Sequence, residues 1–144
     1  MDDERAPHIT PLSAEECWEH LDRTGMGALA TAAEGQADAF PINFLADGRT
    51  LLFRTAPGKK VVELTIAPHA AFIAQGHDAD GYWSVVIRGL VELLTDEVEA
   101  IGSGALELAS WAAGAKRLFL RLTPPTVEGR RVQRADLDRS VLYS

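Results

Sequence analysis

The chain has 144 residues, of which 47% are hydrophobic and 24% charged, a composition typical of one globular domain with its own core. A single cysteine, Cys17, excludes a disulfide framework and every paired-cysteine metal or redox motif. The net charge of −7 argues against nucleic acid as a partner, and no apolar run approaches the ~20 residues of a membrane span. Because the acidic start lacks the features of a signal peptide, we expect a cytoplasmic protein without membrane attachment.

Three helices are expected in chain order. Ser13 followed by Glu16 is a capping-box pattern, and it predicts a first helix over residues 14–24. A second, short helix is expected over residues 59–66, because apolar residues recur there and a proline follows. A third is expected near residues 96–108, where acidic side chains fill the first turn.

Short apolar runs separated by turn residues predict a mainly β fold. Pro41 indicates an edge, a bulge or a ligand-facing kink in its strand, and Gly89 indicates a bulge or bend in a long one. Five or six antiparallel strands with few helices favour a small barrel. Strands are expected over residues 27–32, 37–46, 50–55, 70–75, 82–95 and 118–122, with an extension over 126–132. The domain is expected over residues 12–135, between an N-terminal tail (1–11) and a C-terminal tail (136–144).

The motifs of several common protein classes are either absent or lie between the wrong secondary-structure elements. Residues 25–30 match the letters of a dinucleotide-binding fingerprint, but a helix precedes them and a strand follows, which reverses the required order. The four histidines lack metal-ligand spacing, so no metal site is predicted. Cys17 lies on the apolar face of the first predicted helix, where a buried structural thiol is expected.

One short basic island interrupts this acidic chain. Residues 49–62 contain four basic and no acidic side chains, and they surround a Pro-Gly turn. A compact anion such as a phosphate needs positive charge and several N–H and O–H donors. Arg54, Thr55, Lys59 and Lys60 supply them, and the start of the second helix adds its dipole. The alternative interpretation of the same island is a solvated loop.

Neighbouring strands carry residues suited to a flat ring attached to that phosphate. Such a ring needs an aromatic contact and an amide that bonds to its heteroatoms. Trp83 supplies the first and Asn43 the second.

The same residues carry a resemblance to the pyridoxamine 5′-phosphate oxidase-like, FMN-binding split-barrel proteins. Their flavin-phosphate segment is similar to residues 51–61 (LLFRTAPGKKV), and the preceding strand is similar to residues 40–44 (FPINF). The family's long strand resembles residues 82–89 (YWSVVIRG). The C-terminal signature of a short branch resembles Trp111 together with residues 123–132.

The resemblance implies a six-stranded antiparallel split β-barrel that forms a homodimer with two FMN sites at the interface. It implies that Arg54, Thr55, Lys59 and Lys60 hold the phosphate, with Lys59 the weaker candidate. Trp83 and Ser84 would close the site, and Trp111 would reach over from the partner or belong to the dimer core. The residues implied to lie along the flavin ring, partly through backbone groups, are Pro41, Ile42, Asn43 and Phe44.

Departures from the family pattern narrow the expected function. No lysine stands near Phe44 for a substrate phosphate, and no histidine follows His77, so vitamin B6 oxidation is not expected. We expect an FMN-dependent oxidoreductase that passes hydride to a small organic acceptor. The alternatives are a non-catalytic flavin-binding or storage module, a reductase dependent on the deazaflavin F420, and haem binding through His69 or His77.

Overall fold

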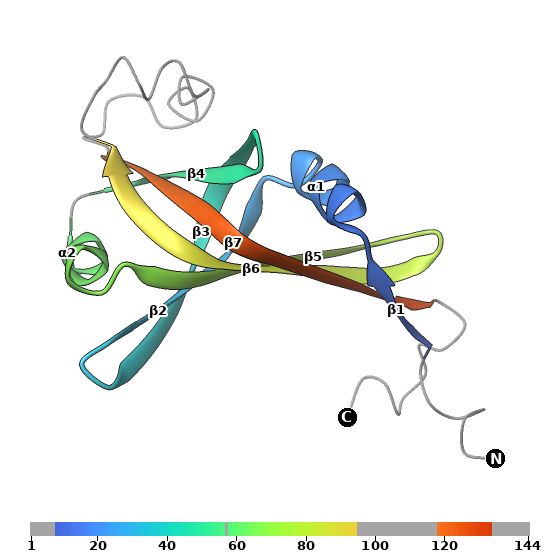
Figure 1. The fold of residues 1–144 in the computed structure, drawn as a ribbon, viewed down its shortest axis with the longest axis horizontal. Helices are drawn as coiled ribbons and strands as arrows, with labels where there is room; N and C mark the ends of the chain where they lie inside the picture. The colour runs from blue at the N-terminus through green and yellow to red at the C-terminus, as the bar shows by residue number, and fades with distance from the viewer. Residues whose placement is uncertain (1–7, 57, 95–117, 134–144) are drawn as a thin grey trace.

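The structure, a computed structural model, describes residues 8–56, 58–94 and 118–133 (Figure 1). Within those ranges it contains seven strands and two helices. The elements are β1 (Ile9–Leu12), α1 (Ala14–Asp22), β2 (Met26–Ala33), β3 (Gln36–Asp47), β4 (Thr50–Thr55), α2 (Lys59–Ile66), β5 (His69–Asp78), β6 (Gly81–Leu94) and β7 (Leu118–Gln133).

Six of the strands close into an antiparallel barrel, which confirms the predicted fold class. The strand order is β1-β7-β4-β3-β2-β5-β6, and a further pairing between β6 and β7 closes the ring. The seventh strand, β1, adds to the far half of β7.

The barrel is split because β6 and β7 run on beyond it. The second half of β6 pairs with the start of β7 inside the barrel, whereas the first half pairs with the end of β7 outside it. The register shifts between Arg88 and Leu90, so the predicted irregularity at Gly89 is confirmed. Outside the barrel, β1, the end of β7, the start of β6 and the end of β5 form a sheet extension (Figure 1).

Aromatic side chains fill the barrel. The rings of Phe44 and Phe72 meet edge to face with centroids 4.8 Å apart, and Phe53 lies 5.5 Å from Phe72. Gly27 makes room for this cluster, because a Cβ atom there would overlap the ring of Phe72. Buried and exposed residues therefore alternate along the strands, because every second side chain faces this one packed interior.

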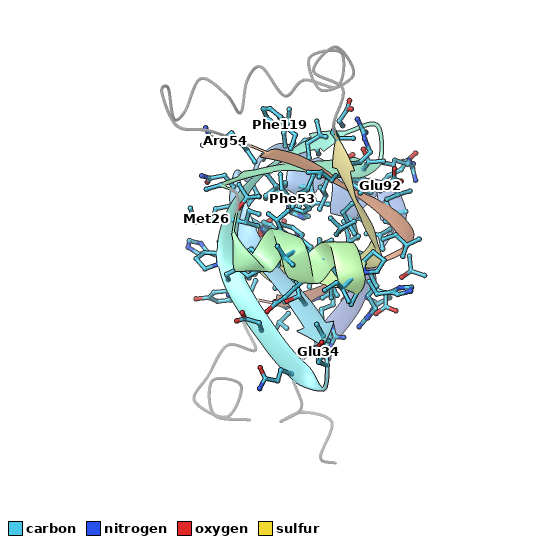
Figure 2. All side chains as sticks on the ribbon, turned by 90° about the vertical axis from the view of Figure 1, so that its left-hand side faces the viewer. Met26, Glu34, Phe53, Arg54, Glu92 and Phe119 are labelled. Carbon is cyan, nitrogen blue, oxygen red and sulfur yellow. The ribbon has the colours of Figure 1, made fainter. Side chains whose placement is uncertain are left out.

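The two helices cover different parts of the barrel. α1 begins with the predicted capping box, in which the backbone N–H of Ser13 donates to Glu16 at 3.0 Å and that of Glu16 donates to Ser13 at 3.1 Å. α2 lies across the end of the barrel, with Val61 and Leu64 buried and Val62 and Ile66 exposed (Figure 2). Neither helix has the length and apolar character needed to cross a membrane, a finding limited to the described residues.

Several elements differ from the sequence prediction or fall outside it. β1 begins inside the segment predicted to be a tail, because Ile9–Leu12 finds a pairing partner in Gly129–Val132. β7 is one continuous strand, whereas the sequence predicted a strand and a separate extension. Pro41 does lie at a local edge, since β3 pairs with β4 only from Phe44 onward. The helix predicted near residues 96–108 lies outside the described residues.

Candidate functional site

The basic island forms a corner where β4 leads into α2. β4 ends at Thr55, and Gly58 is the N-cap of α2. Gly58 supplies no side-chain cap, and its carbonyl accepts from the N–H groups of Val61 and Val62, each at 3.2 Å. The N–H groups of the first turn of a helix point out beyond its N-terminus, so this corner offers donors and a positive dipole end to an anion.

Outward-facing side chains adjoin this corner. Met26 pairs with Asn43 across β2 and β3, and Arg54 pairs with Phe119 across β4 and β7. Asn43 precedes Phe44, whose partner is Phe53, so Asn43 and Arg54 are neighbours across β3 and β4. Figure 2 shows Met26, Arg54 and Phe119 on this end of the barrel. The structure therefore places the half-buried Arg54 next to Asn43, at the end of the strand that leads into α2.

Of the four β3 residues predicted to lie along the flavin ring, two face outward and two face the barrel core. Pro41 is exposed and Asn43 is partly exposed, on the outer face of β3. Ile42 and Phe44 are 6% and 1% exposed and belong to the barrel core. The backbone N–H of Phe44 already donates to the carbonyl of Gly25 at 3.1 Å. The side chains of Ile42 and Phe44 therefore do not line a surface site in this conformation.

Three predicted residues lie partly or wholly beyond what the structure describes. Lys59 and Lys60 are the first two residues of α2, so their backbone stands at the corner, but their side chains are not among the described ones. Trp111 lies outside the described residues.

Trp83 and Ser84 lie at the opposite end of the molecule from this corner. They belong to the β5–β6 hairpin of the sheet extension, whereas the start of α2 lies at the far side of the barrel (Figure 1). As neighbours on one strand they point to opposite faces. Trp83 is 7% exposed and faces α1, and Ser84 lies on the outer face. One chain does not bring all the predicted site residues together.

A polar cluster under α1 fixes Trp83. His20 stacks on its indole with ring centroids 4.4 Å apart and planes 18° apart. Arg131 donates to both carboxylate oxygens of Asp78, at 2.7 and 3.0 Å, and lies 3.3 Å from Nε2 of His20. Because a guanidinium only donates, Nε2 is the acceptor and the neutral ring carries its proton on Nδ1.

Charge and burial shift the pKa values in this cluster. Burial lowers the pKa of His20, and the positive charge of Arg131 lowers it further. The hydrogen bonds from Arg131 lower the pKa of Asp78. Burial raises the pKa of the Cys17 thiol, as expected for a structural cysteine. These groups stabilise the inner side of the sheet extension.

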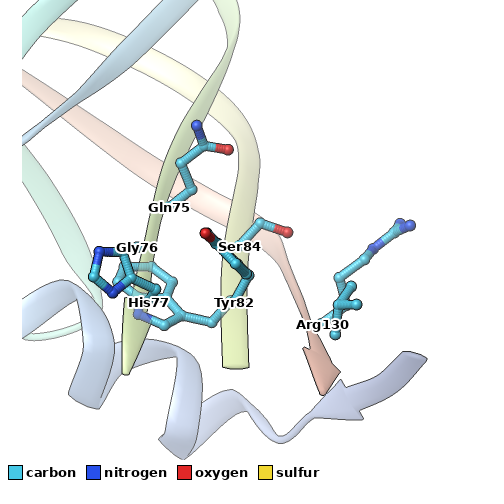
Figure 3. A pocket seen from close by; sticks show the side chains of 8 residues that line it. Gln75, Gly76, His77, Tyr82, Ser84 and Arg130 are labelled. Carbon is cyan, nitrogen blue, oxygen red and sulfur yellow. The ribbon is translucent and has the colours of Figure 1, made fainter. Parts of the chain in front are cut away.

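The outer side of the extension carries a groove of about 390 Å³ (Figure 3). A second groove of about 360 Å³ adjoins it over β1, β6 and β7, and Ser84 and Arg130 line both. In the second groove, Arg88 pairs with Glu128 at 3.4 Å. The lining residues of the first groove are Gln75, Gly76, His77, Tyr82, Trp83, Ser84, Arg130 and Val132.

Sequence reasoning assigned no role to Gln75, Tyr82 or Arg130. Gln75 and Tyr82 share one signal, alternation, because each occupies an outward position on a strand that buries every second residue. Arg130 lies beside them through the pairing of β7 with β6. Alternation alone does not show which outward residues lie side by side. The strand register shows this, because Gln75 pairs with Ser84 and Ser84 pairs with Arg130.

The closed six-stranded antiparallel barrel, its sheet extension and the donor-rich corner at its capped end define a split-barrel protein. The family model described as pyridoxamine 5′-phosphate oxidase matches residues 13–131, and the chain belongs to this family.

Known proteins similar to this chain include flavin-binding ones. An FAD-binding protein of Mesorhizobium loti is 26% identical, with a TM-score of 0.78, over 90% of this chain and 100% of that one. An FAD-binding protein of Mycobacterium smegmatis is 38% identical, with a TM-score of 0.73, over 86% of this chain and 98% of that one. An uncharacterized protein of Mycobacterium tuberculosis is 33% identical over 86 residues, which are 60% of this chain and 78% of that protein.

Proposed function

We propose that this chain binds a flavin nucleotide, with the flavin-side phosphate at the corner formed by Arg54, Thr55 and the start of α2. The observation that carries the proposal is this corner, where Arg54 and Thr55 end β4 directly before the N-terminus of α2, in a chain of net charge −7. The similarity of the chain to two FAD-binding proteins, at 26% and 38% identity, also supports the proposal.

FMN was the cofactor predicted from the sequence, and FAD contains the same riboflavin and first phosphate. The corner therefore serves either nucleotide, and the two FAD-binding relatives favour FAD. On the outer face of β3, Asn43 is placed to bond to a ring heteroatom, and Pro41 offers an apolar edge. The deazaflavin F420 remains the third cofactor to test.

We further propose that the site is completed in a homodimer. The corner lies at one end of the chain, and the first groove, which Ser84 lines, lies at the other (Figure 1). A two-fold partner is therefore needed to bring the corner of one copy against the groove of the other. The outer faces of β2, β5 and β6 supply an apolar contact surface, because Ala28 pairs with Ile73 and Ile73 pairs with Val86. Ile73 is 40% exposed in the single chain.

A bound flavin would supply hydride transfer to a small organic acceptor, and the chain would position it. Arg54 and the α2 N-terminus would neutralise the phosphate, and Asn43 would orient the ring. Phe44 fills the core at the position near which the family resemblance implies a substrate-phosphate lysine, so oxidation of a B6 phosphate gains no support. We therefore propose an oxidoreductase acting on another acceptor.

One observation favours a second candidate, a non-catalytic flavin-binding module. The described outward side chains of β3 beside the corner are those of Pro41 and Asn43, and neither carries a charge that could bind a substrate. A flavin held there without a substrate contact would bind without turnover.

Titration of the purified protein with FMN, FAD and F420 tests both candidates. We expect a shifted absorption spectrum and quenched fluorescence for at least one flavin. Bound flavin that is reduced and then reoxidised by added quinones or nitroaromatics indicates an oxidoreductase, and bound flavin without turnover indicates the non-catalytic module. Absence of binding by either flavin at high micromolar concentration contradicts the proposal.

A further inference from the structure

The groove on the outer face of the sheet extension has its own recognition chemistry, separate from the phosphate corner. Its polar row is continuous across three strands, because Gln75 pairs with Ser84 and Ser84 pairs with Arg130. Gln75 and Ser84 supply an amide and a hydroxyl, and Arg130 supplies a guanidinium (Figure 3). Residues paired in this way lie side by side on one face, so a single ligand group reaches more than one of them.

The charge of this row favours an anion. Arg130 is exposed, and no carboxylate among the described residues forms an ion pair with it. The nearby Glu128 on the same face is paired with Arg88, and Asp78 is held by Arg131 on the other face. A guanidinium with free donors in a chain of net charge −7 binds carboxylate or phosphate oxygens with well-matched geometry.

The next row of the same face is aromatic and apolar. His77 pairs with Tyr82, and Tyr82 pairs with Val132. The His77 and Tyr82 rings meet edge to face with centroids 5.7 Å apart, and Tyr82 is 48% exposed. Rows two residues apart are separated by roughly 7 Å along a strand, which is the scale of one aromatic ring with a short acidic substituent.

We propose that this groove binds a small planar organic anion, with its carboxylate on Arg130 and Ser84 and its ring beside Tyr82 and His77. Binding itself depends only on residues of one chain. The further assignment of this anion class as the acceptor beside the flavin rests on the function proposed above.

Isothermal titration of the full-length protein with trans-cinnamate tests the binding, with neutral cinnamamide as the matched ligand. We expect Arg130→Gln to raise the Kd for cinnamate roughly tenfold or more, because one charge-assisted hydrogen-bond pair is lost. Arg49→Gln, which removes the same charge at the β3–β4 turn, outside the lining of both grooves, should leave the Kd unchanged. Tyr82→Ala should weaken cinnamate more than it weakens acetate.

Equal affinity for cinnamate in wild type and Arg130→Gln overturns the proposal, and so does equal affinity for cinnamamide or no binding of cinnamate at all. Matching thermal melting curves for the variants exclude misfolding as the cause of a loss. The titration is run with and without bound flavin. Cinnamate binding without any flavin binding contradicts the flavin proposal and supports the anion groove. Flavin binding without cinnamate binding supports the flavin proposal and contradicts the anion groove.

Discussion

Arg54 is the described side chain that most directly links the candidate site to an anion. It is half-buried at the end of β4, next to Asn43 and beside the start of α2. A guanidinium in such a place strengthens phosphate binding through charge and through paired N–H donors.

Arg54→Gln is therefore expected to weaken flavin binding by about 1.5–3 kcal/mol, the cost typical of a lost charge-assisted hydrogen bond. The readout is quenching of flavin fluorescence during titration. Arg49→Gln is the control, because it makes the same charge change at the β3–β4 turn and should not alter the affinity. Equal affinities for the two variants would remove Arg54 from the site.

Protonation of His20 makes the free energy of unfolding depend on pH. Its pKa is lowered in the folded protein by burial and by Arg131, so the unfolded chain binds the proton more readily. Stability from the neutral ring is then fully present above the unfolded pKa of about 6.5 and is lost as the pH falls below it.

We expect the free energy of unfolding to fall between pH 8 and pH 5, and His20→Gln to remove part of that slope. Denaturant unfolding at a series of pH values measures both. The replacement keeps a polar side chain near Arg131 but does not titrate. An identical slope in the variant contradicts the role given to His20.

Side-chain orientation marks the limit of residue-level prediction from this sequence. The strand holding Pro41 to Phe44 was identified, yet only Pro41 and Asn43 face outward, and Ile42 and Phe44 fill the core. Likewise Trp83 packs against His20, because α1 covers that face of the hairpin. The faces of a strand follow from what packs on each side, which the local sequence does not state.

At the scale of elements, local signals were sufficient wherever a cap or turn ends the element. The capping box set the start of α1, and the Asp-Gly-Arg turn between β3 and β4 has positive φ at Gly48 and Arg49, as its sequence suggests. β1 and the continuity of β7 were missed, because each depends on pairing with a partner far along the chain. The end of β7 is held by β1 and by α1.

The close approach of α1 to β7 depends on Gly129. A Cβ atom at this position would lie 2.5 Å from the Sγ atom of Cys17, which is fully buried. Gly129→Ala is thus expected to lower the free energy of unfolding by about 1–3 kcal/mol through overpacking. Urea unfolding measures the loss, and Gly58→Ala, where no atom lies within 4 Å of the added carbon, should cost much less.

A double variant tests the cause of that loss. Cys17→Ala removes the sulfur that Gly129→Ala would overlap, so the combined variant should lose less stability than the sum of the two single changes. Strict additivity would mean that the clash with Cys17 is not the reason for the loss.

At the scale of the whole molecule, the decisive feature is the separation of the two parts of the proposed site. The corner at the start of α2 and the groove around Ser84 and Arg130 lie at opposite ends of the chain (Figure 1). The apolar outer faces of β2, β5 and β6 lie between them. In the homodimer that we propose, a two-fold axis across that surface joins the corner of each copy to the groove of the other, which gives two equal sites.

Mixing two variants that damage different halves tests this shared flavin site most directly. Arg54→Gln weakens the corner, and Ser84→Trp fills the groove, so each variant alone should retain little flavin. After unfolding and refolding together, mixed dimers have one intact site, and we predict about one bound flavin for every four chains. Recovery of no flavin above that of the separate variants, with dimers confirmed by light scattering, would contradict the shared site.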